Sequence, residues 1–349
     1  MRTAVQSRGL DGVLVTSPVN IRYLTGFTGT NGLLVLTARK VVLITDARYA
    51  LQAKLEVRKP VHVIVTHDGL YEEASRRALL PSGSRIGFEA HQVTYAHYRT
   101  LRRLFPDLSL VSTRDVVEDG MVVKDQEEIA FMRKAADISS RVFTEVLSVV
   151  RPGVKELDVA AEISYLHRKF GAEGDAFDVI VASGERSAFP HARAGSKEIR
   201  NGELVTMDFG CVVGGYHSDI TRTIAVGRVG ARARRMYDAV RSAQQEALEH
   251  ARAGILARDL DAVARKRLAK SGFGRYFQHS LGHGLGLRLH ERPRISRLGT
   301  ETLLPGSVIT IEPGVYIPNF GGVRIEDVVL LHDRDSEILS NAPRDFLTV

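Results

Sequence analysis

Residues 206–223 read TMDFGCVVGGYHSDITRT, two largely apolar segments joined by the pair Gly214-Gly215. Gly-Gly is a common two-residue turn of a β-hairpin, because glycine adopts positive φ without strain. With this pair as the turn, Asp208 faces Thr221 across the hairpin and Asp219 faces Gly210. The two aspartates then project from the same face as diagonal neighbours, close enough to bind one ion. Carboxylates so placed repel each other unless a cation or a shared proton lies between them.

The hairpin alone leaves a second interpretation open, in which both aspartates lie on a solvated strand face or cap a turn. Aspartate is disfavoured inside strands, which speaks against that reading. Phe209, Ile220 and the preceding valines also indicate a half-buried sheet. Further segments are needed to decide.

Three later segments carry more groups of the same kind. Residues 278–287 read QHSLGHGLGL and contain His279 and His283, and His290 follows three residues later. The glycines beside His283 would let the backbone approach a metal while the imidazole binds it. The run is not a dinucleotide-binding loop, because it does not follow a first strand and lacks the full glycine spacing with a following acid.

Two glutamates complete the set. Glu312 stands in TIEPGVY, residues 310–316, where a buried carboxylate needs a partner. Glu326 stands in GGVRIEDVV, residues 321–329, on the same strand face as Arg324, so a local salt bridge is the competing interpretation. Four carboxylates and one imidazole need roughly two divalent cations for charge balance, and this oxygen-rich set suits Mn²⁺ or a similar ion. The predicted ligands are Asp208, Asp219, His283, Glu312 and Glu326.

The remaining sequence predicts two domains, because 349 residues are long for a single core. Residues 1–118 alternate strands and helices and form a small α/β domain. Its expected strands are 12–16, 33–36, 41–44 and 61–65, and its expected helices are 71–80 and 95–105. Residues 119–349 form an α+β domain with helices on one side of an antiparallel sheet. Its expected helices are 125–149, 156–170, 231–253 and 260–270, and its expected strands are 178–182, 203–209, 216–226, 308–311, 323–331 and 338–339.

Composition narrows the class of protein. The net charge is +7, but 48 Lys and Arg are interleaved with 41 Asp and Glu, which indicates a solvated surface more than a nucleic-acid site. The single cysteine, Cys211, excludes an intramolecular disulfide and lies in an apolar segment, where a buried thiol is expected. The N-terminus lacks the apolar core of a signal peptide, and no apolar run could span a bilayer. We therefore expect a cytoplasmic protein without nucleic-acid or membrane partners.

Taken together, these motifs resemble the metallopeptidases with the "pita-bread" fold. That family includes Xaa-Pro dipeptidases (prolidases), aminopeptidase P and methionine aminopeptidase. Residues 15–27, VTSPVNIRYLTGF, resemble its creatinase-type N-terminal domain. Methionine aminopeptidases lack that domain, so the resemblance favours the proline-directed branch.

The resemblance implies a role for each matching residue. The five predicted ligands would hold two metal ions, Mn²⁺ or else Co²⁺ or Zn²⁺, with Asp219 and Glu326 bridging them. Glu312 would also act as a catalytic base, and His191, His290 and Tyr316 would be catalytic. His191, His279, His290, Arg294 and Arg324 would contact the substrate or support the ligands. One departure is Ala192-Arg193 after His191, where prolidases usually carry a glycine.

Several functions remain open within the family. An arginine suits the free C-terminal carboxylate of a dipeptide, so Arg294 favours an Xaa-Pro dipeptidase over aminopeptidase P. A creatinase-like hydrolase without metals and a non-catalytic interaction module are disfavoured, because all five ligands are present. The resemblance further implies a homodimer that acts on small proline-containing peptides.

Overall fold

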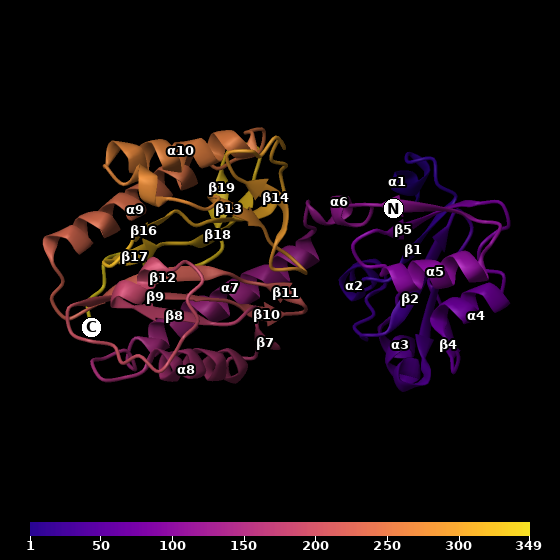
Figure 1. Ribbon diagram of the computed structural model, residues 1–349, viewed down its shortest axis with the longest axis horizontal. Helices are drawn as coiled ribbons and strands as arrows, with labels where there is room; N and C mark the ends of the chain where they lie inside the picture. The colour runs from indigo at the N-terminus through magenta and orange to yellow at the C-terminus, as the bar shows by residue number, and fades with distance from the viewer. The chain divides into compact units, whose positions relative to one another are not determined.

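The structure is a computed structural model that describes all 349 residues. The chain forms two compact units, Met1–Met121 and Val122–Val349, which are described separately (Figure 1). The sequence placed this boundary after residue 118. No helix in either unit is both long and apolar enough to span a bilayer.

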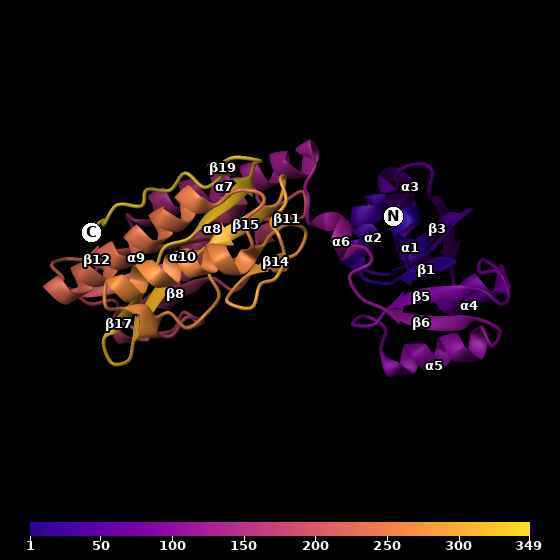
Figure 2. The same ribbon diagram turned by 90° about the horizontal axis from the view of Figure 1, so that it is seen from above.

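A six-stranded mixed sheet forms the centre of the N-terminal unit, in the order β4-β3-β2-β1-β5-β6. Residues of β1 alternate between two buried cores, with Val13 and Val15 on one face and Leu14 on the other. Figure 2 shows α4 and α5 on one side of this sheet and α2 and α3 on the other. The strands are Gly12–Val15, Gly32–Thr37, Val41–Asp46, His62–Thr66, Arg85–Glu89 and Ser109–Thr113. The helices α1 to α6 are Arg2–Gln6, Pro18–Thr25, Ala50–Glu56, Leu70–Arg76, Tyr95–Leu104 and Glu118–Met121.

The four strands predicted in this unit are confirmed as β1 to β4. The prediction missed β5 and β6, whose polar residues hide the apolar pattern. It also missed α2, although Ser17 caps that helix by accepting a hydrogen bond from the backbone of Asn20 and Pro18 occupies its first turn. Both features mark the start of a helix, and a prediction based on apolar periodicity alone does not use them.

The second unit begins with the long helix α7, Gln126–Val146. Asp125 caps it, and the Glu128 side chain returns a bond to the backbone of Asp125, which completes a capping box. The remaining helices are α8 (Glu156–Lys169), α9 (Ala231–His250) and α10 (Ala257–Lys270). All four were predicted from the sequence within a few residues at each end.

The helices of this unit form two pairs, each covering its own core. Helices α7 and α8 pack with β8, β9, β10 and β12, whereas α9 and α10 pack mainly with β15 to β18. In Figure 1, α9 and α10 lie above the strands and α8 lies below them, so each helix pair covers its own group of strands. The strands β7 to β13 are Gly174–Asp175, Ile180–Ser183, Glu203–Phe209, Cys211–Val213, Tyr216–His217, Ile220–Val226 and Gly282–Gly284. The strands β14 to β19 are Glu291–Ile295, Val308–Ile311, Gly314–Ile317, Gly321–Arg324, Asp327–Leu331 and Ser336–Ile338.

The hairpin register predicted from Gly214-Gly215 is confirmed. Val213 pairs with Tyr216, and Asp208 pairs with Thr221. Two predicted continuous strands are interrupted, however. Residues 216–226 divide into β11 and β12 at Asp219, and residues 323–331 divide into β17 and β18 at Glu326. Each interruption occurs at a predicted metal ligand.

Candidate metal centre and active site

All five predicted ligands line one cavity of about 720 Å³ in the second unit. Asp208 lies in β9, His283 lies in β13, and Glu312 directly follows β15. Asp219 and Glu326 occupy the two strand interruptions, where the backbone N–H of Glu326 donates to the carbonyl oxygen of Thr221 at 3.0 Å. The sheet register therefore brings together side chains that are far apart in the sequence.

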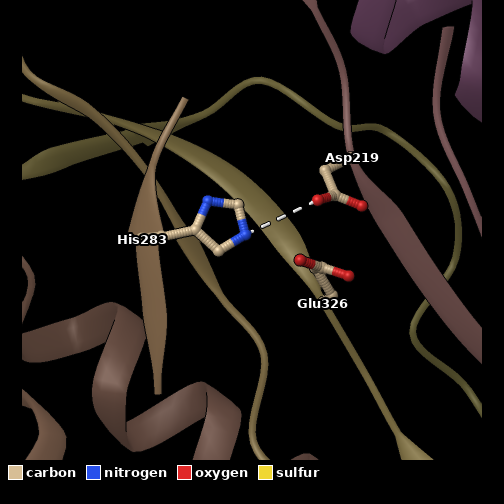
Figure 3. A group of neighbouring side chains, drawn as sticks. All are labelled: Asp219, His283 and Glu326. Atoms are coloured by element: carbon tan, nitrogen blue, oxygen red, sulfur yellow. Dashed lines mark ion pairs between the residues drawn. The ribbon is translucent and has the colours of Figure 1, made fainter. Parts of the chain in front are cut away.

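Three of these groups form the tightest cluster. One ligand atom each from Asp219, His283 and Glu326 lies within 4.8 Å of the other two (Figure 3). The Nε2 atom of His283 is 3.7 Å from Oδ2 of Asp219 and 3.6 Å from Oε1 of Glu312. The imidazole thus points its Nε2 atom at two carboxylates.

The environment of His283 selects the tautomer that can bind a cation. Its Nδ1 atom lies 3.0 Å from the carbonyl oxygen of Gly284, to which only a protonated nitrogen can donate. Burial lowers the pKa of His283 to about 4, so the ring is neutral near pH 7. The lone pair is then on Nε2, which faces the carboxylates, as in a metal-binding histidine oriented by its second nitrogen.

The pKa values of three carboxylates among the predicted ligands are strongly raised. Burial, reinforced by the charges of the neighbouring acids, raises the pKa of Glu326 to about 8. The same two causes, with burial the larger, raise the pKa of Asp219 and of Glu312 well above the ordinary value. Thr221 offsets part of this effect by donating its hydroxyl to Oε2 of Glu326 at 2.6 Å. The protein without cations therefore holds these acids in an unfavourable arrangement.

Three unpaired oxygen atoms among the predicted ligands fit a pair of divalent cations. Oδ1 of Asp208, Oδ1 of Asp219 and Oε1 of Glu326 are buried and have no hydrogen-bond partner. Buried polar atoms are normally paired, so these three oxygens call for an additional ligand. A hard or borderline divalent cation matches carboxylate oxygens with one imidazole nitrogen.

Arg324 is the buried cation next to this cluster. Its guanidinium group donates to Oδ2 of Asp208, to the Tyr316 hydroxyl at 2.6 Å and to the Thr221 hydroxyl at 3.0 Å. Burial disfavours its charge, but Tyr316 and the carboxylates outweigh burial, and the pKa of Arg324 rises. Arg324 thus fixes the orientation of Asp208 and leaves its Oδ1 atom free.

Tyr316 and His279 contact each other next to Arg324. The Tyr316 hydroxyl lies 3.0 Å from Nε2 of His279, and Nδ1 of His279 lies 2.8 Å from the carbonyl oxygen of Ser280. Burial is the main cause that lowers the pKa of His279 to about 3, so the ring is neutral. Both of its nitrogens are occupied, and its clearest function in this geometry is to orient Tyr316.

The other predicted site residues differ in whether they line the cavity. His191, His279, His290, Arg294 and Arg324 line the cavity together with the five ligand candidates. Tyr316 does not line the cavity but contacts it through Arg324 and His279. Burial lowers the pKa of His290, whose ring lies 4.3 Å from that of His283.

Sequence reasoning missed part of the cavity wall. Phe177, Asp178 and Arg193 line it, as does Glu291, which forms a buried ion pair with Lys124 at 2.9 Å. Glu291 directly follows the predicted site residue His290, and this adjacency was the only feature of the sequence that could have placed Glu291 in the cavity wall. The explanation given for the glycines also changes. A Cβ on Gly282 would lie 1.9 Å from the Thr310 carbonyl oxygen, so this glycine allows close strand pairing and not metal approach.

The comparisons with known proteins agree with this geometry. The chain matches the creatinase/prolidase N-terminal domain over residues 1–120 and the metallopeptidase family M24 over residues 130–333. The chain belongs to metallopeptidase family M24. The expected creatinase-like N-terminal domain and pita-bread catalytic domain are thus confirmed, and the protein is a metallopeptidase.

Three similar proteins of this family come from bacteria and an archaeon. An Xaa-Pro dipeptidase of Pyrococcus furiosus is 37% identical, covering 98% of this chain and 97% of the relative. The structure of an Xaa-Pro dipeptidase from Bacillus anthracis has a TM-score of 0.96 and 36% identity, covering 100% and 98% of the two chains. The structure of an X-Pro aminopeptidase from Thermotoga maritima has a TM-score of 0.92 and 35% identity, covering 99% and 100%.

Proposed function

We propose that the protein is an Xaa-Pro dipeptidase that uses two divalent cations, Mn²⁺ in the cell, to hydrolyse the bond before proline. The observation that carries this proposal is the set of five ligand candidates with three unpaired buried oxygens. Dipeptidases among the M24 relatives support the substrate class. Asp208, Asp219, His283, Glu312 and Glu326 would hold the cations.

Arg294 favours a dipeptide over a longer peptide. It is an exposed side chain on the cavity wall, and no hydrogen bond or ion pair engages its guanidinium group. A free C-terminal carboxylate can accept two parallel hydrogen bonds from such a group. The aminopeptidase relative makes aminopeptidase P the alternative, because the two activities share the metal centre.

Each of the catalytic residues in the cavity would have a separate role in the reaction. When bound, the cations would supply a water of lowered pKa and a Lewis acid for the scissile carbonyl group. Glu312 lines the cavity beside the other ligands and would accept the proton of the attacking water, and burial raises its pKa above the ordinary value. His290, neutral because burial lowers its pKa, donates an N–H to the developing oxyanion. His191 lies on the same wall and orients the substrate.

A substrate-length assay tests the proposal. The purified protein, dialysed against a chelator and reloaded with Mn²⁺, is assayed with the dipeptide Ala-Pro and the tripeptide Ala-Pro-Ala. We expect metal-dependent cleavage of Ala-Pro with a higher kcat/KM than that of the tripeptide. The Arg294→Met variant should lose this preference mainly through a higher KM. Preference of the unmodified protein for the tripeptide would instead identify an aminopeptidase P, and equal activity after chelation would exclude the metal mechanism.

Three further attributes belong to the proposal and rest on the family resemblance. We expect a homodimer, which light scattering at several protein concentrations would test. We also expect a cytoplasmic location, consistent with a single buried cysteine that needs no oxidising compartment. Metal analysis of protein isolated without added metal would identify the ion.

A further inference from the structure

Three charged side chains on the wall of the catalytic cavity have no partner of their own. Arg193, Arg294 and Asp178 all line the cavity and are exposed, and no ion pair or side-chain hydrogen bond engages any of them. Glu291 also lines the cavity, but Lys124 neutralises it at 2.9 Å. The wall outside the metal centre therefore offers two free guanidinium groups and one free carboxylate.

These three charged groups outnumber the charges of a dipeptide whose first side chain is uncharged. An Xaa-Pro dipeptide with an uncharged side chain carries one ammonium group and one carboxylate. These would engage one acidic and one basic group of the wall and leave one guanidinium group without a partner. A substrate with a further carboxylate complements all three groups, and complementary charge contributes chiefly to specificity.

We propose that Arg193 is a specificity-determining residue that favours an acidic residue, aspartate or glutamate, before the proline. The inference rests on the proposed dipeptidase function, in which Arg294 binds the C-terminal carboxylate. Arg193 is then the guanidinium group available for the side chain of the first residue. Asp178 would bind the ammonium group.

The surroundings of Arg193 provide room for such a side chain. Arg193, Asp178 and Phe177 also line an adjoining cavity of about 610 Å³ beside α8. Arg168 lines that second cavity as well. Asp175 also lines this cavity, and its carboxylate oxygens lie 2.6 Å from His167 and accept a hydrogen bond from Ser164. No ion pair joins Asp178 to Arg193, although both line the two cavities.

The dipeptides Glu-Pro and Gln-Pro provide the test, because they have nearly the same shape and differ in charge. The Mn²⁺-loaded protein is assayed with both, together with Ala-Pro as a reference substrate. We expect kcat/KM to be about two- to fivefold higher for Glu-Pro than for Gln-Pro, the upper part of the range for an exposed ion pair. This ratio should fall at high salt, which screens exposed charges.

Variants assign the preference to one residue. Arg193→Gln should bring the Glu-Pro to Gln-Pro ratio to about one, and Arg193→Glu should instead favour Lys-Pro over Gln-Pro. Arg297→Gln removes an exposed cation that does not line the cavity, so it should keep the ratio of the unmodified protein.

The outcomes separate this inference from the proposed function. If Ala-Pro is cleaved but the unmodified protein does not prefer Glu-Pro, the specificity assignment is wrong and the dipeptidase proposal stands. A preference that persists in Arg193→Gln would also overturn the assignment. If none of the dipeptides is cleaved by the metal-loaded protein, the proposed function itself fails.

Discussion

Removing the metal should make the catalytic unit lose stability as the pH rises from about 6.5 to about 8. Burial and mutual repulsion raise the pKa of Glu326 to about 8 in the folded protein, and those of Asp219 and Glu312 are also raised. In the unfolded chain these acids have pKa values near 4 and are ionised throughout this range. The folded metal-free protein therefore binds more protons than the unfolded chain, and a protein in that situation becomes less stable as the pH rises.

The lower limit of this range follows from the histidines. Burial lowers the pKa of His279 to about 3 and of His283 to about 4. Their folded-state pKa values lie below the unfolded value of about 6.5, so they make stability rise with pH up to that point and then stop contributing. Burial also raises the pKa of the Cys211 thiol, so measurements should end near pH 8, before the unfolded thiol ionises.

The expected size comes from the pKa of Glu326. A group that stays protonated only in the folded state changes the free energy of unfolding by about 1.4 kcal/mol per pH unit. Over this range Glu326 alone gives a loss of about 2 kcal/mol, and its neighbours add to the loss. For a domain of this size, that corresponds to a fall in Tm of roughly 4–8 °C.

Differential scanning calorimetry of the chelator-dialysed protein at the two pH values measures this fall. Adding excess Mn²⁺ should raise Tm more at the higher pH, because the cations bind the ionised carboxylates. Glu326→Gln removes one of the titrating groups and should reduce the pH dependence of the metal-free protein. A constant or rising Tm without metal would refute the electrostatic account of the cluster.

Three substitutions extend these expectations. Glu312→Ala should abolish turnover of Ala-Pro while circular dichroism shows a folded protein, and measurable turnover would remove Glu312 from its proposed role. Lys124→Met leaves Glu291 buried without its partner, so urea unfolding should show a loss of about 3–5 kcal/mol that Lys124→Met/Glu291→Gln partly restores. Gly282→Ala places a Cβ against the Thr310 carbonyl oxygen and should weaken Mn²⁺ binding measured by calorimetry, whereas unchanged affinity would show that β13 tolerates the shift.

Local signals in the sequence predicted much of the hairpin and the ligand set. Gly214-Gly215 fixed the register, and that register put Asp208 opposite Thr221, as the structure shows. The amphipathic pattern predicted α7 for a similar reason, since it depends on residues a few positions apart.

Features that depend on distant contacts were not predicted. The interruption at Glu326 arises because its backbone pairs with Thr221, more than a hundred residues earlier. Apolar runs on both sides of Glu326 conceal that break, since a buried strand and two shorter ones have the same pattern. The pairing of Lys124 with Glu291 and the place of Arg193 on the cavity wall likewise need the tertiary structure.

Arg324→Lys tests whether the metal centre depends on the shape of the buried cation as well as on its charge. Arg324 serves Asp208, Tyr316 and Thr221 at once, which a planar guanidinium group can do and an ammonium group on a flexible chain cannot. Lysine retains the positive charge that offsets the carboxylates, but it should leave Asp208 and Tyr316 less well oriented. Loss of a partner that orients a ligand typically weakens metal binding by about 10–100-fold.

Calorimetric titration of the chelator-treated Arg324→Lys variant with Mn²⁺ measures this loss, with Arg297→Lys on the exposed surface as the matched control. A weakened affinity in a variant of unchanged Tm would assign the effect to ligand orientation. Unchanged affinity would mean that the charge of residue 324 is sufficient. The hydrogen bonds to Asp208 and Tyr316 would then be a consequence of packing and not a requirement of the site.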